Sequence, residues 1–374
     1  MRQKILIVSA VFYPEKSPRS FRTTELAKEL SRQGHEVTVC FPTHGYDYSF
    51  FESVHNLRIK NLGTLKIRPI DIKGNRLGLL LRKIVRRGLN LLFEWPDIQL
   101  MFMVSKMLKK EHDYDMLISV AVPHPIHWGV AWAWNGKQKI AKTWIADCGD
   151  SYMLARLDTF KKPFYFKHFE KSFCRRCTLI SVPFKELGDQ FYKEFRSKII
   201  TIPQGFDLNE IKRFNAPFKN ERPTFMFAGS VIPGIRDLRL FLDFLHTWKD
   251  DFCFIVYTRQ REWFNTYKNR LKERIEIRDY IDHQALIYEM SKMDFLVNVD
   301  TVYDSKSNVE AIPSKLIDYA MSGRPILNLI SNDLDIKKVK AFFAGDYSGA
   351  RVIEISRYDI RLVAEKFIQA CKLV

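Results

Sequence analysis

The sequence predicts an α/β protein with two doubly wound parallel sheets. Its 374 residues exceed the length of one typical domain. Residues 4–10 contain the continuous apolar run Ile5 to Val8, as buried parallel strands do, and a strand, a helix and a second strand follow one another within about 40 residues. The same alternation starts again at residues 224–228. We therefore expect two Rossmann-like domains.

The expected strands are short apolar runs separated by helical or polar segments. Residues 209–223 are polar and contain prolines, which is typical of a linker between domains. Strands are predicted before this linker at residues 4–10, 35–40, 115–121, 144–147, 178–183 and 199–203, and after it at 224–228, 252–257, 275–278, 294–299 and 326–330.

The composition limits the classes of partner. A net charge of +17 is typical of proteins that bind nucleic acid, anionic membranes or polyanionic substrates. No zinc-finger spacing or aromatic RNA-binding signature is present, so we expect no nucleic acid. The pair Cys174 and Cys177 is expected on a helix rather than at a metal or redox site. The sequence shows no signal-peptide pattern and no apolar run of about 18 residues, so we expect a cytoplasmic protein.

Residues 76–110 mix bulky apolar side chains with basic ones. Leucines and isoleucines alternate with Arg82, Lys83, Arg86 and Arg87. This pattern is typical of an amphipathic helix on an anionic membrane surface. Two core helices with a solvated basic face would give the same pattern, and both interpretations stay open. The net charge favours the membrane, which would make the protein peripheral on the inner face.

Residues 308–327 predict a short helix with features of an anion site. Ser314 has the type of an N-cap residue, and Gly323 the type that ends a helix. The free amides and the dipole of a helix N-terminus both favour a phosphate. Lys315 adds positive charge there, and Asp318 lies one turn further on, where it can bind a hydroxyl group. An ordinary capped helix would have the same spacing.

The run Pro-Ser-Lys-Leu-Ile-Asp-Tyr in this segment resembles the donor-site signature of the retaining family-4 glycosyltransferases, which have the GT-B fold. In that family two acidic residues are separated by seven others. The resemblance implies that Glu310 contacts the transferred sugar and that Asp318 contacts the ribose. It further implies that Lys315 and the amides of Ser314 to Leu316 bind the diphosphate.

The resemblance extends over nearly the whole chain. It implies two domains that face each other across a cleft. Residues 1–206 would bind the acceptor, residues 207–356 the nucleotide sugar, and residues 357–374 would cross back to the first domain as a helix. The sequence Gln-Gly-Phe-Asp at residues 204–207 is similar to the family's crossover into the second domain.

The loop after the first strand of the second domain contains further donor candidates, Gly229, Ser230 and Arg236. In the family this loop holds the diphosphate, usually with cations at the positions of Ser230 and Ile235. We expect Arg236 to replace the missing charge, with Lys315 as the second cation. Glycine allows backbone amides to approach a phosphate closely.

Five candidates lie in the first domain. His124 and His127 follow a strand, at the edge where α/β sheets bind ligands, and both match histidines of some family members. Structural histidines would explain them as well. Asp150 follows the next strand and can accept a hydrogen bond or a proton from a hydroxyl group. Arg19 and Arg22 are acceptor-side candidates, and the resemblance supports Arg22 alone.

These features predict a glycosyltransferase that moves a sugar from a nucleotide-diphosphate sugar to a saccharide or lipid-linked saccharide acceptor. The setting would be bacterial surface-polysaccharide synthesis, such as lipopolysaccharide or capsule. His124, His127, Asp150 and Glu310 are the catalytic candidates. The resemblance implies retention of configuration. Cations and amides would stabilise the leaving diphosphate, so we expect no metal or other cofactor. The alternatives are a nucleotide-sugar epimerase or hydrolase and a non-catalytic nucleotide- or saccharide-binding protein.

Overall fold

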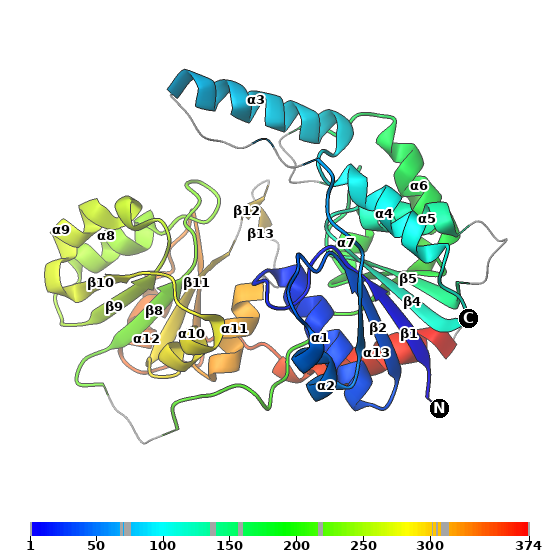
Figure 1. Cartoon of the computed structure of the whole chain (residues 1–374). Coiled ribbons are helices and arrows are strands. Elements are labelled where there is room, and N and C mark those ends of the chain that lie inside the picture. Colours follow the sequence, from blue (N-terminus) through cyan, green and yellow to red (C-terminus); the bar gives the residue numbers. More distant parts are fainter. Residues whose placement is uncertain are drawn as a thin grey trace. The chain divides into compact units, whose positions relative to one another are not determined.

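The computed structural model describes residues 2–67, 70, 76–134, 140–155, 160–215, 220–300, 302–303, 306–307 and 314–372. The chain divides into two compact units (Figure 1). Unit 1 consists of Met1–Asp207 and Tyr358–Val374, and unit 2 of Leu208–Arg357. Each unit has its own parallel sheet, which confirms the predicted class of two doubly wound domains.

Unit 1 contains a seven-stranded parallel sheet in the order β3-β2-β1-β4-β5-β6-β7. Its central strands are buried on both faces, as expected of parallel strands that are covered by helices. The strands are β1 Lys4–Val8, β2 Glu36–Phe41, β3 Arg58–Asn61, β4 Tyr114–Ala121, β5 Ala141–Cys148, β6 Leu179–Val182 and β7 Ile199–Thr201.

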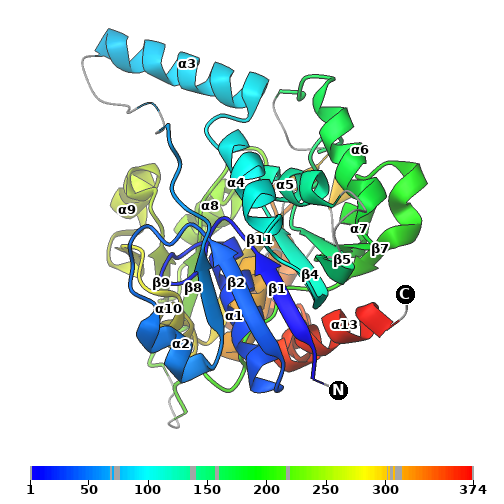
Figure 2. The same ribbon diagram turned by 45° about the vertical axis from the view of Figure 1, so that its right-hand side comes forward.

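Helices cover both faces of this sheet (Figure 2). Ile5 and Ile7 face the core under α1, α2 and α13, whereas Leu6 and Val8 face the core under α4, α5 and α6. This alternation is the two-residue period of a strand. The helices are α1 Pro18–Arg32, α2 Ser49–His55, α3 Arg76–Phe93, α4 Ile98–Leu108, α5 Pro125–Ala133, α6 Phe166–Arg176, α7 Lys185–Gly188 and α13 Ile360–Lys372.

The C-terminal helix α13 returns to unit 1. The N–H of Phe206 donates to the carbonyl of Tyr358 at 2.8 Å, and the N–H of Ile360 donates to the carbonyl of Phe206 at 2.9 Å. Ile360, Val363 and Phe367 are buried in the same core as the apolar face of α1. The predicted return of the last helix is therefore confirmed.

Unit 2 contains a five-stranded parallel sheet in the order β10-β9-β8-β11-β14. Helices α8, α9 and α12 cover one face, and α10 and α11 cover the other. Its elements are β8 Thr224–Ala228, α8 Arg239–Thr247, β9 Cys253–Tyr257, α9 Asn265–Leu271, β10 Ile275–Arg278, α10 His283–Met290, β11 Phe295–Asp300, the antiparallel pair β12 Val302–Tyr303 and β13 Lys306–Ser307, α11 Ser314–Ser322, β14 Ile326–Ile330 and α12 Ile336–Phe343.

The strand order of each sheet reverses beside its first strand. In unit 1, β1 lies between β2 and β4, and in unit 2, β8 lies between β9 and β11. Open α/β sheets bind ligands at such switch points, outside the carboxyl ends of the strands. The loops after β1, β4, β8 and β11 are therefore where functional side chains are expected.

The segment 76–110 forms two helices of different character. In α4, Leu100, Val104 and Leu108 are buried in the core of unit 1. In α3, by contrast, Leu80 and Ile84 are 58% and 59% exposed. The core interpretation thus holds for α4, whereas apolar side chains of α3 are exposed to solvent. Within the described ranges, no helix is both long enough and apolar enough to cross a membrane.

Candidate functional site

At the switch point of unit 2, the loop after β8 meets the start of α11. Lys315 Nζ lies 3.5 Å from the position that a Cβ on Gly229 would occupy, and 4.9 Å from the centroid of the Phe227 ring. Gly229 has a φ of 141°, which residues with side chains rarely adopt. The structure therefore brings Gly229 and Lys315 together, as a donor site built from both segments requires.

The ammonium group of Lys315 is the unusual charge of this site. Its Nζ is buried and has no hydrogen-bond partner among the residues that the structure describes. Burial, with a contribution from the charge of Arg236, lowers the pKa of Lys315 to about 7, and Asp300 acts in the opposite direction. Burying a charge without a partner costs free energy, and a bound anion would remove that cost.

The nearby carboxylate of Asp300 is engaged with other groups. Arg351 Nη1 donates to its two oxygens at 2.8 and 2.9 Å. Asn328 Nδ2 and Asn298 Nδ2 donate to the same carboxylate at 2.7 and 3.1 Å. Asp300 therefore has its own cation, Arg351, and its charge offsets the lowered pKa of Lys315 only in part.

Tyr319 fixes α11 against the sheet. Its buried hydroxyl accepts a hydrogen bond from the N–H of Ala228 at 2.8 Å and donates to the carbonyl of Ala228 at 3.2 Å. Lys315 precedes Tyr319 by about one helical turn, and the apolar side chain of Leu316 is fully buried. Sequence reasoning gave Tyr319 no role, although it ends the recognised motif. The prediction of Ser314 as the N-cap is corrected, since Ser314 is itself the first residue of the helix.

Asp237 shapes the loop that follows β8. Its carboxylate accepts a hydrogen bond from the N–H of Gly234 at 3.0 Å. Arg236 is half-buried, and its charge acts on Lys315, so the two expected cations lie near each other. Ser230, at a position where the family usually carries a cation, is exposed. The residue that folds this loop, Asp237, was not a sequence-based candidate.

Asp318 on α11 pairs with His283, the first residue of α10. Nε2 of His283 lies 2.8 Å from Oδ1 of Asp318. Burial lowers the pKa of His283, but the hydrogen bond and the charge of Asp318 outweigh burial, so the pKa is raised. His283 therefore orients the Asp318 carboxylate, a role that sequence reasoning missed. The other predicted acid, Glu310, lies outside the described residues.

In unit 1, Arg22 is bound entirely within the fold. Its Nε and Nη2 each donate to a different oxygen of Asp147 at 2.6 Å, and its Nη1 donates to the carbonyl of Pro203 at 2.5 Å. Arg22 is 4% exposed and Asp147 is 1% exposed. Burial raises the pKa of Asp147, but the charge and hydrogen bonds of Arg22 and a hydrogen bond from Ser181 outweigh burial. The pKa is therefore lowered overall, and the carboxyl group is ionised. Arg22 thus joins α1 to β5 instead of facing an acceptor.

Arg19 lies against the backbone of Gly149. A Cβ on Gly149 would lie 1.5 Å from Nη2 of Arg19, so a larger residue would displace the guanidinium. The same Nη2 lies 3.9 Å from Oδ2 of Asp150, whose side chain is 69% exposed. The predicted residues Arg19 and Asp150 are therefore adjacent, at the carboxyl ends of β1 and β5.

His124 and His127 differ in their hydrogen-bond partners. His127 belongs to α5 rather than to the expected loop, with Nδ1 2.8 Å from Ser119 Oγ and Nε2 3.3 Å from Cys148 Sγ. Burial lowers its pKa to about 3. His124 immediately precedes α5, and its ring centroid lies 4.9 Å from that of Tyr152. Its Nδ1 is buried without a hydrogen-bond partner in the described part of the chain. His124 is thus the better placed of the two to meet a ligand.

The exposed helix α3 is tied to the segment that follows β5. The hydroxyl of Tyr152 donates to Glu94 Oε1 at 2.7 Å, and Glu94 also pairs with Lys162. On α3 itself, the Arg87 guanidinium lies 4.7 Å from the centroid of the Phe160 ring. These contacts connect the amphipathic helix with the neighbourhood of His124.

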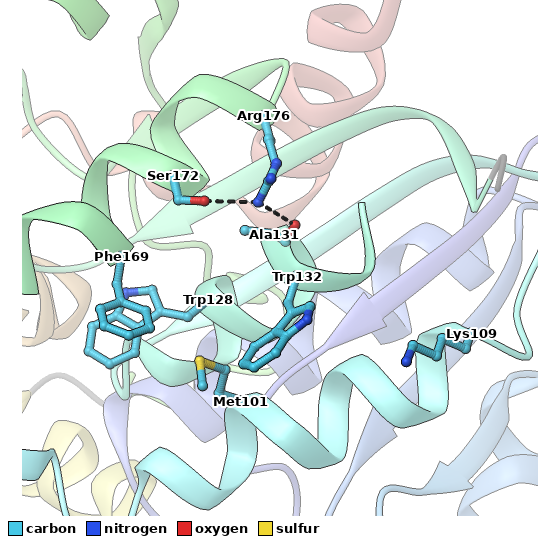
Figure 3. Close-up of a pocket in the computed structure, with 8 residues that line it drawn as sticks. All are labelled: Met101, Lys109, Trp128, Ala131, Trp132, Phe169, Ser172 and Arg176. Carbon is cyan, nitrogen blue, oxygen red and sulfur yellow. Dashed lines mark hydrogen bonds between the residues drawn. The ribbon is translucent and has the colours of Figure 1, made fainter. Parts of the chain in front are cut away.

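A pocket of about 450 Å³ lies between α4, α5 and α6 (Figure 3). Arg176 Nη1 donates to the Ala131 carbonyl and to the Ser172 hydroxyl, each at 2.9 Å. The charged residues of the lining are both basic, and the rest is mainly apolar, which suits an anionic amphiphile. The lining consists of Met101, Lys109, Trp128, Ala131, Trp132, Phe169, Ser172 and Arg176.

The two doubly wound parallel sheets define the GT-B class of fold, and solved structures share it. A glycosyltransferase from Rickettsia africae has a TM-score of 0.63 at 12% identity, over 100% of this chain and 99% of that one. HepE of Anabaena in complex with UDP has a TM-score of 0.63 at 13% identity, over 99% and 100%. The lipopolysaccharide outer core galactosyltransferase WaaB has a TM-score of 0.60 at 12% identity, over 99% of each chain.

The sequence model of Glycosyltransferase Family 4 matches residues 21–210, just over half of the chain. In the comparison with curated protein sequences, no sequence matches this chain. The chain therefore belongs to glycosyltransferase family 4, and its activity is glycosyl transfer from a nucleotide-sugar donor.

Proposed function

We propose that unit 2 binds the diphosphate of the donor between Lys315 and the N-terminal amides of α11. The observation that carries this proposal is the buried Lys315 Nζ, which has no hydrogen-bond partner among the described residues. A diphosphate would supply the missing negative charge. Arg236 and the helix dipole add to the attraction, and Gly229 leaves room for close approach.

The same groups would act on the leaving group. As the bond between the sugar and the diphosphate breaks, negative charge grows on the β-phosphate, and fixed positive groups lower the barrier by stabilising it. Lys315, Arg236 and the amides of α11 would supply this stabilisation without a divalent metal. Transfer with retention of configuration is part of the proposal and rests on the family resemblance.

Asp318 is assigned to the ribose of the donor. His283 holds one of its oxygens, which leaves the orientation of the carboxylate defined for a hydroxyl group. Glu310 is assigned to the transferred sugar on the basis of the motif alone. The structures of HepE and of TarM from S. aureus are described as complexes with UDP, which makes UDP-sugars the first donors to test.

The acceptor is assigned to unit 1, at the carboxyl ends of β1, β4 and β5. Asp150 is exposed and can accept a hydrogen bond or a proton from the attacking hydroxyl group, with Arg19 beside it. Burial, with the charges around it, holds the pKa of His124 well below its usual value, so its imidazole is neutral and can accept a hydrogen bond from an acceptor hydroxyl group. His127 would support this region from inside the core.

We assign the acceptor to the saccharides and lipid-linked saccharides of bacterial surface-polysaccharide synthesis. The exposed apolar and basic faces of α3 support attachment to an anionic membrane from the cytoplasmic side. The pocket with Lys109 and Arg176 provides a second basic and apolar surface in unit 1. Both features suit an acceptor that carries an anionic lipid.

A thermal-shift screen of the full chain against nucleotide sugars tests the proposal, because a bound ligand raises the apparent stability. We expect one donor to raise the melting temperature and to be consumed with an acceptor in the presence of EDTA. The anomeric coupling constant of the product, measured by NMR, should equal that of the donor. Failure of every nucleotide sugar to stabilise the protein would contradict the proposal.

A further inference from the structure

A second pocket of unit 1, of about 310 Å³, lies between α1 and α2, beside the loops that follow β1 and β2. Both loops are at the carboxyl edge of the sheet, where α/β proteins bind ligands. The pocket is within the size range of small-molecule sites. None of its lining residues belongs to the donor or acceptor residues described above.

Aromatic rings form the walls of this pocket and remain open to solvent. Tyr13, Tyr46 and Phe50 are 42%, 46% and 80% exposed. The ring of Tyr13 stacks on that of Phe51 with centroids 5.0 Å apart, and it meets Tyr46 edge-on at 6.3 Å. Exposed aromatic rings that are held by neighbouring rings offer flat apolar faces at little entropic cost.

Hydrogen bonds to the backbone of Tyr13 fix the loop that carries its ring. The N–H of Tyr13 donates to Thr24 Oγ1 at 3.0 Å, and the hydroxyl of Tyr48 donates to the carbonyl of Tyr13 at 2.5 Å. The aromatic wall is therefore preformed, as a binding site for a small ligand requires.

Hydroxyl and carboxylate groups outnumber the cations in the lining of this pocket. Hydrogen bonds from Ser49 lower the pKa of Asp47, so this carboxyl group is ionised. Glu25 accepts hydrogen bonds from Lys28 Nζ at 3.1 and 3.2 Å. The two acids and one lysine give the pocket a slight negative charge, although the whole chain carries +17. A phosphate or an anionic lipid headgroup would be repelled here.

We propose that this pocket binds a neutral saccharide unit of the acceptor. Sugar rings present C–H faces that pack on aromatic rings and hydroxyl groups that donate to carboxylates, which are the two kinds of surface that Tyr46, Phe50 and Asp47 provide. Because unit 1 is the acceptor side in the proposed function, on which this assignment rests, the bound unit would be part of the acceptor. The loop that carries Tyr13 leads into α1, whose second residue, Arg19, lies next to Asp150.

The test is saturation-transfer NMR of the full chain with a panel of neutral mono- and disaccharides. We expect at least one sugar to bind, and the variants Phe50→Ala and Tyr46→Ala to weaken its binding about tenfold, the usual effect of losing one aromatic contact. Phe164→Ala is the matched control, because Phe164 is 74% exposed in unit 1 but outside this pocket. It should leave sugar binding unchanged.

Kinetics give a second measurement. Phe50→Ala should raise the KM for the acceptor about tenfold and leave the KM for the donor and kcat unchanged. The assignment is overturned if no sugar binds, if both variants bind sugar like the wild type, or if Phe50→Ala instead weakens binding to anionic vesicles. Failure of the proposed function would show differently, as sugar binding at this pocket without any transfer from a nucleotide sugar.

Discussion

Each unit of the molecule buries one prominent cation, and the two are treated in opposite ways. Arg22 in unit 1 makes paired hydrogen bonds to Asp147 and a further one to Pro203. Lys315 in unit 2 has a buried Nζ and no hydrogen-bond partner in the part of the chain that the structure describes. Arg22 has a counter-ion at 2.6 Å, whereas burial lowers the pKa of Lys315 to about 7.

The difference separates a structural charge from a binding charge. A buried ion pair with complete hydrogen bonds holds elements together, and removing one partner leaves the other charge uncompensated. A buried cation without a partner weakens the empty protein and gains its compensation from a ligand. Substitution of Arg22 should therefore affect folding, whereas substitution of Lys315 should affect donor binding.

The largest expected effect is that of Arg22→Ala. The variant leaves the Asp147 carboxylate buried without its cation, so we expect a loss of about 3–5 kcal/mol in the free energy of unfolding of unit 1. Urea unfolding followed by far-UV circular dichroism measures this change. The double variant Arg22→Met with Asp147→Leu removes both charges and should recover much of the loss. A single variant as stable as the wild type would refute the structural role of Arg22.

Lys315→Ala should reduce glycosyl transfer about 100- to 1000-fold, because it removes the cation that faces the developing charge. The fold should remain intact. The pKa of Lys315 is lowered in the folded state, so above pH 7 the unfolded chain binds more protons than the folded chain. Burial of the charged lysine therefore destabilises the wild type at low pH, and this cost disappears as the pH rises. The variant should thus lose this pH dependence. Lys337→Ala, an exposed lysine of unit 2, is the control for transfer.

Asp318→Asn should lower transfer about 10- to 100-fold, the effect of losing one hydrogen bond to a charged group. The loss should be larger with a ribose donor than with the matching 2′-deoxyribose donor, since the proposed contact is to a ribose hydroxyl. Steady-state kinetics with both donors measure the difference. His283→Gln, which removes the partner of Asp318, should give a smaller loss. Equal losses with both donors would place Asp318 elsewhere in the site.

A further prediction concerns the pH dependence of donor affinity. Below pH 7 Lys315 already carries its proton, whereas above pH 7 donor binding must take up a proton, so the affinity should fall by up to about tenfold per pH unit. Calorimetry with an intact nucleotide sugar between pH 6 and 9 measures this fall. Lys315→Arg keeps its charge throughout and should flatten the profile. A flat profile for the wild type would contradict a lowered lysine pKa.

The smallest effect on transfer is expected for the exposed basic side chains of α3. Replacing Arg82, Lys83 and Arg86 of α3 with glutamine should reduce flotation with anionic vesicles, by about 1 kcal/mol per residue at low salt. Transfer to a water-soluble acceptor should not change. Lys337→Gln with Lys340→Gln, on exposed positions of unit 2, is the control. Unchanged flotation of the α3 variant would remove the membrane assignment.

Much of the fold could be predicted because it follows local patterns. Three strands of unit 2, at residues 224–228, 275–278 and 326–330, match the expected ranges, since each is an apolar run bounded by polar residues. Gly323 has a φ of 75°, as a residue that ends a helix does. Residues 76–110 could not be resolved by pattern, because apolar side chains at helical spacing serve a core face in α4 and an exposed face in α3.

The candidate site was predictable only in part. The motif around Lys315 and the loop at Gly229 could each be recognised, and the structure places them in contact. The sequence offered no way to tell that His127 is enclosed, since a histidine after a strand looks the same whether it precedes a helix or enters it. His283 was missed for a similar reason, because its partner Asp318 lies 35 positions away.

What the sequence determined by itself is the class of the protein, from the alternation of strands and helices, the break between the domains, and the motif at residues 313–319. The tertiary structure alone decided which charges are compensated. Burial and pairing depend on residues brought together from distant positions, as with Arg22 and Asp147, which are 125 positions apart. The local sequence gives Lys315 and Arg22 the same charge, and only packing pairs Arg22 with a carboxylate while Lys315 Nζ is buried without a hydrogen-bond partner among the described residues.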